Sequence, residues 1–204
     1  MLSSSRLRLL LLITSLALAG IFLGRIIYIN MASQEAYTLP SGGDFQLKSA
    51  QGPVSLSQYP QKAIVVYFGY TYCPDICPTS LMTFSQAMQN LTPEEAARVQ
   101  GIFISVDPER DHPERLASYV DFFDTRLIGA TGSQAQIDQL TRAYGAFYRK
   151  VELPDSAMGY AIDHSSNLYI VNSQGDMLGV IPHSHQAQPL VDTLRKVLAQ
   201  PHLL

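Results

Sequence analysis

The only two cysteines of the chain, Cys73 and Cys77, lie close together in the stretch YFGYTYCPDICPTS. A disulfide between them would close a very small loop, and the stabilisation that a disulfide gives grows with loop length. The pair is therefore a poor structural staple. Two chemistries remain open, because neighbouring thiols can cycle between dithiol and disulfide, and two thiolates can also hold a soft ion such as Cu(I). A dithiol oxidoreductase typically has two residues between its cysteines, whereas this pair has three.

The elements around the pair favour reactive sulfurs. Residues 63–70 (AIVVYFGY) form a continuous, β-branched apolar run that predicts a strand buried on both faces. Residues 80–91 (SLMTFSQAMQNL) follow with the apolar spacing of a helix. The cysteines thus precede or open a helix, where the first N–H groups and the helix dipole stabilise a thiolate. Pro78 suits an early helical position because proline has no N–H to leave unsatisfied.

A metal site needs further ligands, and histidine is the best candidate. Zinc would want four ligands, and the chain has too few cysteines and close-spaced histidines to supply them. The histidines are His112, His164, His183, His185 and His202. We favour His164, because it stands just before a predicted strand that a thioredoxin-like topology packs beside the cysteine motif. The spacing of His183 and His185 would allow chelation, but we interpret them as part of a solvated loop. The sequence assigns no role to His112 or His202.

Strands and helices alternate along the chain, which predicts an α/β domain. A short β-hairpin is expected within residues 44–59. Further strands are expected at 99–107, 127–132 and 167–181, the last being a pair joined through Gln174-Gly175, with helices at 113–123, 133–145 and 186–200. The arrangement matches a thioredoxin-like fold with an N-terminal β-hairpin extension.

The N-terminus has the pattern of an export signal. Arg6 and Arg8 precede an uncharged run from Leu9 to Gly24, and apolar residues continue to Ile29, which makes about the 20 residues that a transmembrane helix needs. We favour an uncleaved anchor over cleavage after Ala19. The predicted division is an anchor at 1–32, a linker at 33–43 and a domain at 44–204. By the positive-inside rule, the protein would cross a bacterial inner membrane once, with its C-terminal domain in the periplasm.

The exported part is acidic. All charges in the first thirty residues are basic, so the remainder carries eleven Lys and Arg against 17 Asp and Glu. This balance argues against nucleic acid as a partner.

Three motifs resemble the Sco/SenC/PrrC family of copper-binding proteins: CPDICP after VVYFGYTY, then FISVDPERDHPERL, then YAIDHSSNLYIVNSQGD. The likeness runs from about residue 38 to the C-terminus. It implies a membrane-anchored thioredoxin-like domain in which Cys73, Cys77 and His164 bind copper, as Cu(I), Cu(II) or both. The same two cysteines would form a reversible disulfide.

The resemblance also points to acidic residues around this site. Asp75 matches the family's aspartate between the cysteines, and the family's SVDPERD stretch matches Ser105 to Asp111, which includes Asp107 and which we expect to shape the site. We expect Asp75, Asp107 and Asp163 to support the three ligands. An ordinary ion pair at Asp107 or Arg110 is the alternative interpretation.

The resemblance supports two functions, which exclude each other at any one moment because a Cys73–Cys77 disulfide cannot ligate Cu(I) as two thiolates. The first is a metallochaperone that brings copper to the binuclear copper centre of a haem-copper oxidase, cytochrome c oxidase. The second is a thiol–disulfide oxidoreductase that reduces the cysteines of that centre or other periplasmic dithiols. The expected partners are the copper-centre subunit of the oxidase, a periplasmic thiol reductant or copper donor, and the inner membrane. A purely structural periplasmic module would leave the placement of the cysteines unexplained.

Overall fold

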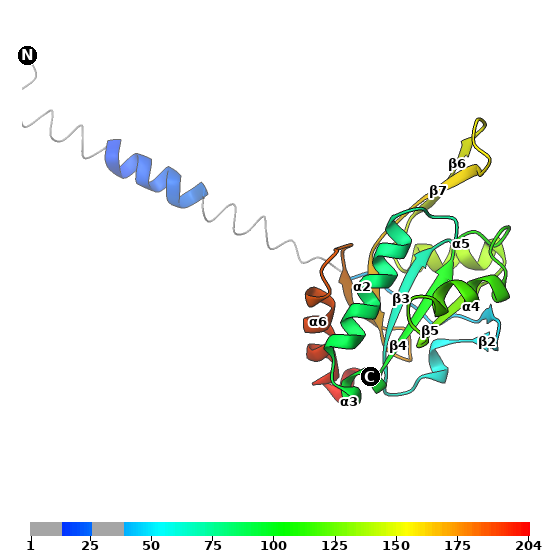
Figure 1. Cartoon of the computed structure of the whole chain (residues 1–204). Helices are drawn as coiled ribbons and strands as arrows, with labels where there is room; N and C mark the ends of the chain where they lie inside the picture. The colour runs from blue at the N-terminus through cyan, green and yellow to red at the C-terminus, as the bar shows by residue number, and fades with distance from the viewer. Residues whose placement is uncertain (1–13, 26–38) are drawn as a thin grey trace, which may run out of the picture. The chain divides into compact units, whose positions relative to one another are not determined.

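A seven-stranded mixed β-sheet forms the centre of the domain in the computed structural model, which describes residues 14–25 and 39–204 (Figure 1). The strand order is β2-β1-β5-β4-β3-β8-β9. In chain order these strands are β1 (Leu47–Ser49), β2 (Gly52–Val54), β3 (Ala63–Gly69), β4 (Val99–Ser105), β5 (Leu127–Thr131), β8 (Leu168–Val171) and β9 (Met177–Ile181). The central strands β5, β4 and β3 are parallel, while β1 and β8 join them antiparallel on either side.

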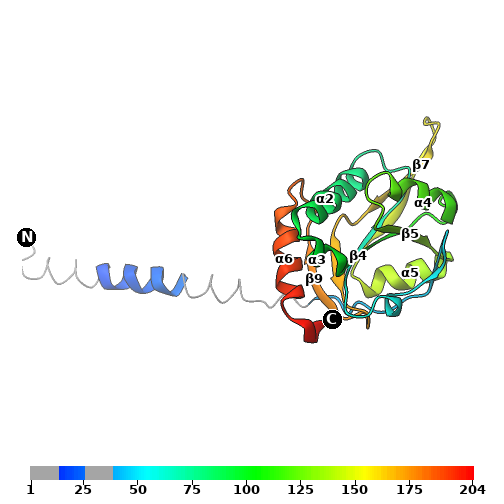
Figure 2. The same ribbon diagram turned by 60° about the horizontal axis from the view of Figure 1, so that its bottom comes forward.

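Helices cover both faces of this sheet (Figure 2). In chain order they are α2 (Ile76–Asn90), α3 (Pro93–Ala97), α4 (Pro113–Asp121), α5 (Gln134–Ala143) and α6 (Gln188–Leu198), with short 3-10 turns at Leu56–Gln58 and Pro201–Leu203. The helices α2, α4 and α6 lie on one face and α5 lies on the other (Figure 2). The site-bearing helix α2 therefore packs directly on the parallel centre of the sheet.

Side chains from β3 and β4 build the core because both strands are buried along their whole length. Successive side chains of a strand point to opposite faces. Tyr67 and Phe103 accordingly meet on the face that carries α2, with ring centres 6.0 Å apart, and Phe68 packs edge-on against Tyr144 at the end of α5. Fully buried aromatic rings of this size dominate core energetics. They give the cysteine loop a rigid base.

Most of the elements expected from the sequence are present. The N-terminal hairpin forms as β1 and β2, and β8 and β9 form the C-terminal antiparallel pair. Ser133 caps α5, its hydroxyl accepting from the backbone N–H of Gln136. One short helix was not expected: α3 begins after Thr92, whose side chain and that of Glu95 form a reciprocal capping box.

A second, two-stranded sheet was also not expected. It consists of β6 (Tyr148–Leu153) and β7 (Gly159–His164), which pair antiparallel with Tyr148 opposite His164. In Figure 1 this hairpin projects beyond the main sheet. His164, predicted to lie just before a buried strand, is the last residue of β7, and three residues separate it from the start of β8. The position of His164 is thus set by the end of the β6–β7 hairpin.

The N-terminal predictions fall largely on residues that the structure does not describe. Residues 14–25 form a helix, while most of the remaining anchor and the linker up to residue 38 lie outside the described ranges. No helix formed by the described residues combines the length and apolar character that a membrane crossing needs. Residues Leu39–Leu204 make up one compact unit. The division at 1–32, 33–43 and 44–204 stays a prediction.

Candidate metal centre

Three side chains from separate elements converge beside the end of β3. Cys73 lies in the loop after β3, Cys77 in the first turn of α2, and His164 at the end of β7. Their ligand atoms all lie within 4.8 Å of one another, and Cys77 Sγ is 3.3 Å from His164 Nε2. Within residues 14–25 and 39–204 this is the one group of three cysteine, histidine or acidic side chains close enough to share an ion. The structure therefore brings the three predicted ligands together.

Local backbone geometry fixes the two sulfurs. Asp75 is the N-cap residue of α2, and the backbone N–H of Cys77 points at Cys73 Sγ over 3.5 Å. Cys77 is fully buried, whereas Cys73 is half-buried. A methyl group at Gly69 would lie 2.6 Å from Cys77 Sγ, which is too close for any real contact. Glycine at the end of β3 thus makes room for the buried sulfur.

The two sulfurs differ in acidity. Hydrogen bonds from the side chain of Cys77, from His164 and from the backbone N–H groups of Asp75 and Cys77 lower the pKa of Cys73 to about 3, against the opposing effect of partial burial. Burial raises the pKa of Cys77 well above its ordinary value, and the adjacent Cys73 raises it further. In the metal-free site at neutral pH, the half-buried Cys73 is therefore a thiolate and the buried Cys77 is a thiol. A soft cation would displace the remaining proton from Cys77.

This asymmetry predicts a selective alkylation pattern. In the native, reduced, metal-free protein, we expect iodoacetamide to label Cys73 nearly as fast at pH 5 as at pH 7, because a thiol with a pKa of about 3 is a thiolate at both. A thiol with an ordinary pKa near 8.5 would slow about 100-fold over that range. Cys77 should stay unlabelled, and mass spectrometry of the peptides gives both rates. Urea-unfolded protein is the control, in which both cysteines should show the ordinary pH dependence. Parallel slowing of both native cysteines would contradict the prediction.

The orientation of His164 places its Nε2 atom beside the sulfurs, where it could bind a metal ion. Its Nδ1 lies 2.9 Å from the carbonyl oxygen of Ser165, and a carbonyl only accepts, so Nδ1 donates to this oxygen. Nε2 is then the nitrogen that faces the sulfurs and that a metal would use. Tyr67 and Tyr70 make T-shaped contacts with the imidazole, with ring centres 6.2 and 5.7 Å away, and restrict its rotation.

Asp107 acts on β7 rather than on the cluster directly. Its carboxylate accepts hydrogen bonds from the Tyr160 hydroxyl at 2.8 Å and from Arg110 Nε at 2.5 Å. Arg110 also donates to the carbonyl oxygens of Met158 and Tyr160, and its guanidinium stacks 3.5 Å above the Tyr160 ring centre. The ion pair named as the alternative is therefore present, and it holds the strand that ends in His164.

Asp111 holds the cysteine loop in place through hydrogen bonds to Thr71. It is completely buried and accepts from the backbone N–H of Thr71 at 2.9 Å, from the Thr71 hydroxyl and from the Ser105 hydroxyl at 2.6 Å. Such hydrogen bonds to a buried carboxylate are strong. The sequence motif SVDPERD includes Asp111, but nothing in its spacing shows that it bonds a loop forty residues away.

The other two predicted acidic residues face solvent. The side chain of Asp75 is exposed and makes no capping bond to α2. Asp163 pairs with Arg149 across the β6–β7 hairpin at 2.7 Å, and about half of its side chain is exposed. As neighbours in a strand, Asp163 and His164 point to opposite faces. A direct supporting role for Asp75 and Asp163 stays a prediction.

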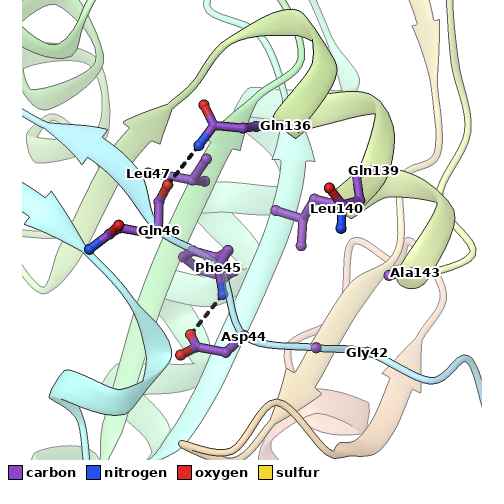
Figure 3. Close-up of a pocket in the computed structure, with 10 residues that line it drawn as sticks. Gly42, Asp44, Phe45, Gln46, Leu47, Gln136, Gln139, Leu140 and Ala143 are labelled. Atoms are coloured by element: carbon purple, nitrogen blue, oxygen red, sulfur yellow. Dashed lines mark hydrogen bonds between the residues drawn. The ribbon is translucent and has the colours of Figure 1, made fainter.

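Two hollows of similar size differ in chemistry. Tyr70, Cys73 and His164 line a shallow pocket of about 350 Å³, so the cluster opens toward solvent. The second, also about 350 Å³, lies between the segment 42–47 and α5 (Figure 3). Asp44 is the only ionisable side chain that lines it, and this carboxylate already accepts from the backbone N–H groups of Phe45 and Leu56. Of these two hollows, only the cysteine pocket is lined by cysteine and histidine side chains.

Comparison with known proteins gives a consistent result. The family model SCO1/SenC matches residues 33–199. The chain is 36% identical over 162 residues to the mitochondrial SCO2 homologue of Mus musculus, covering 78% of this chain and 63% of that protein. It is 36% identical over 138 residues to a SCO2-like protein of Rickettsia felis, covering 67% of each. The chain thus spans about three fifths of the length of the mammalian relatives it matches.

Solved structures resemble the fold closely. Arabidopsis thaliana ScoI with copper bound superposes with a TM-score of 0.71 and 35% identity, covering 78% of this chain and 99% of that one. The apo Sco1 protein of Thermus thermophilus gives 0.69 and 34%, covering 78% and 92%. These likenesses confirm the predicted thioredoxin-like α/β fold.

Proposed function

The chain belongs to the SCO1/SenC family, and on that premise we propose that it is a metallochaperone that carries copper to the binuclear copper centre of cytochrome c oxidase. One observation carries the proposal: the ligand atoms of Cys73, Cys77 and His164 lie within 4.8 Å of one another. Two thiolates and one imidazole suit copper, whereas a structural zinc site takes four ligands. The copper-bound structures of Arabidopsis thaliana and Bradyrhizobium japonicum ScoI, 35% and 33% identical to this chain, support the choice of ion.

The exposure of the site suits cargo better than a resident cofactor. Cys77 is buried, but Cys73 and His164 line a pocket that opens to solvent. A partner's ligands can therefore reach a bound ion from the side of Cys73 and His164 and replace these two before Cys77 releases it. The expected recipient is the copper-centre subunit of the oxidase. A periplasmic thiol reductant would keep the two cysteines reduced, and a periplasmic copper donor would reload the reduced site.

The second candidate function is thiol–disulfide exchange, and the acidity of Cys73 favours it. The Cys73 thiolate would attack a substrate disulfide and form a mixed disulfide, releasing one substrate thiolate. Cys77 would lose its proton, attack Cys73 and release the second substrate thiolate. The substrate is then reduced by two electrons and the Cys73–Cys77 pair is oxidised to a disulfide. Copper carriage and this reaction use the same sulfurs in different states.

A transfer experiment separates the two functions. We expect the reduced, copper-loaded protein to give copper to the reduced apo form of the oxidase copper-centre subunit, so that the absorption of the binuclear centre appears. The copper-free dithiol protein, supplied with an oxidised subunit, provides the matched measurement of disulfide reduction. If the subunit is reduced in the second reaction but gains no copper in the first, the protein is a reductase and the metallochaperone proposal fails.

We further propose that the N-terminus anchors the chain in a bacterial inner membrane with the domain in the periplasm. The uncharged run from Leu9 to Gly24, preceded by Arg6 and Arg8, supports this topology. The expected result is a protein that stays in the membrane fraction at its full mass of 22.5 kDa, measured by fractionation and mass spectrometry. A soluble periplasmic form that begins at Gly20 would instead establish cleavage after Ala19.

A further inference from the structure

The loop after β9 places two imidazoles against the helix that carries Cys77. His183 and His185 have ring centres 5.3 Å apart with their planes at 75°. This is the only contact between two histidine rings in the described part of the chain, which contains all five histidines. The sequence alone suggested a solvated loop, but His183 is half-buried and only His185 is exposed. The pair therefore has a defined position.

Two hydrogen bonds fix this loop on α2. Ser80 Oγ and His183 Nδ1 are 3.0 Å apart, and the Thr83 hydroxyl donates to the carbonyl oxygen of Ser184 at 2.8 Å. Ser80 and Thr83 are buried and lie on consecutive turns of the helix. Because the loop is already held, little ordering remains to be done when a ligand binds. The bond at Nδ1 also leaves Nε2 of His183 as the nitrogen for a metal.

The spacing of the rings fits a shared ion. An imidazole nitrogen binds a divalent ion at about 2.0 Å, which puts the ring centre about 3 Å from the ion. Two imidazoles on one tetrahedral ion then have ring centres about 5 Å apart. The observed separation is 5.3 Å. Imidazole suits Zn, Cu and Ni, and among divalent first-row ions Cu(II) binds nitrogen ligands most tightly.

From this geometry we propose that His183 and His185 form a second metal site, an imidazole-only site for a divalent transition ion with Cu(II) as the tightest. It is separate from the Cys73–Cys77–His164 cluster, shares no ligand with it and does not depend on the proposed copper delivery. Ser80, which holds His183, follows Cys77 by three residues on α2, about 4.5 Å along the helix axis. The two sites would thus lie beside adjoining turns of one helix. The cluster with Cys77 would take soft ions, and the His183–His185 site would take divalent ions that prefer nitrogen ligands.

The test uses the full-length chain with Cys73→Ser, Cys77→Ser and His164→Ala, so that the first cluster cannot bind. Titration with Cu(II), followed by electron paramagnetic resonance, should show one ion per chain with hyperfine splitting from imidazole nitrogen. Adding His185→Ala should weaken binding at least tenfold and remove the two-nitrogen pattern. Because His185 is exposed, this variant leaves the packing on α2 intact. His202→Ala, a histidine in the C-terminal 3-10 turn, is the matched control and should change nothing.

Two outcomes would overturn the proposal. The triple variant could bind no Cu(II) above the level seen after adding both His183→Ala and His185→Ala. Alternatively, His185→Ala could leave the affinity and the nitrogen splitting unchanged, in which case the rings pack against each other without sharing an ion. Retained unfolding midpoints in urea confirm that each variant is folded when its metal content is measured.

Discussion

Replacing Cys73 and Cys77 together by serine is expected to abolish Cu(I) binding, from one ion per chain to less than about a tenth. The variant removes both soft donors and leaves His164 as the only member of the cluster. A serine hydroxyl stays protonated at neutral pH and is a hard, weak donor, so it does not replace a thiolate toward Cu(I). We expect a loss of at least about 1,000-fold in affinity, since two ligands disappear and even changes beyond the ligands cost 10- to 100-fold.

The measurement is copper per chain after equilibration of the reduced protein with Cu(I) and a competing chelator. The chelator removes ions held only by imidazoles, so that the His183–His185 loop does not contribute. His202→Ala controls for weak surface binding, and oxidised wild type is the second control because its disulfide offers no thiolate. Full copper retention by the double variant would show that the cluster is not the copper site.

The fold could be read from the sequence wherever burial gives a clear hydrophobic pattern. Residues 63–70 predicted β3 because both faces of that strand are covered, and Ser133 marked the start of α5 through its capping pattern. The helix α3 was missed although its signal is readable: Thr92, Pro93 and Glu95 form the same kind of pattern. The β6–β7 hairpin is a different case. Exposed and partly buried residues alternate weakly along it, so no hydrophobic period distinguishes it from a loop.

The candidate site was predicted through the fold rather than through local spacing. His164 is distant in sequence from the cysteines, and only the expected topology placed it beside them, as the structure does. The resemblance gave the stretch from Ser105 to Asp111 a shaping role, but the contacts that position the ligands could not be found this way. Asp111 accepts hydrogen bonds from the backbone N–H and the hydroxyl of Thr71, and the Tyr70 hydroxyl accepts one from the backbone N–H of Ile162. Such contacts depend on three-dimensional packing and leave no periodic pattern in the sequence.

Replacing His164 by alanine is expected to separate copper binding from thiol chemistry. Removing one of three ligands should weaken copper binding by at least about 10- to 100-fold, because even residues beyond the ligands have effects of that size. The loss should be largest for Cu(II), a harder ion that gains more from an imidazole than Cu(I) does when two thiolates are present. Oxidase assembly should fall with the copper content.

Thiol–disulfide exchange should survive the same substitution. His164 is only one of several groups that lower the pKa of Cys73, and the side chain of Cys77 is the largest. Removing the imidazole therefore raises the pKa of Cys73, but the remaining hydrogen bonds still keep it below its ordinary value. At pH 7 the thiolate persists, and exchange needs only the thiolate and access to it. Relative to wild type, the alkylation rate of Cys73 in this variant should fall more at pH 5 than at pH 7.

A deletion strain complemented with each variant provides the decisive measurement: oxidase activity and copper content, alongside reduction of a model disulfide by the purified protein. His202→Ala is the matched control, because it removes an exposed histidine of the C-terminal 3-10 turn to which no role is assigned. His164→Gln keeps more of the volume between Tyr67 and Tyr70 and guards against a packing defect. If His164→Ala assembles oxidase normally but no longer reduces disulfides, the imidazole tunes the thiol pair and does not hold copper. The proposal that His164 is the third copper ligand of a metallochaperone would then be wrong.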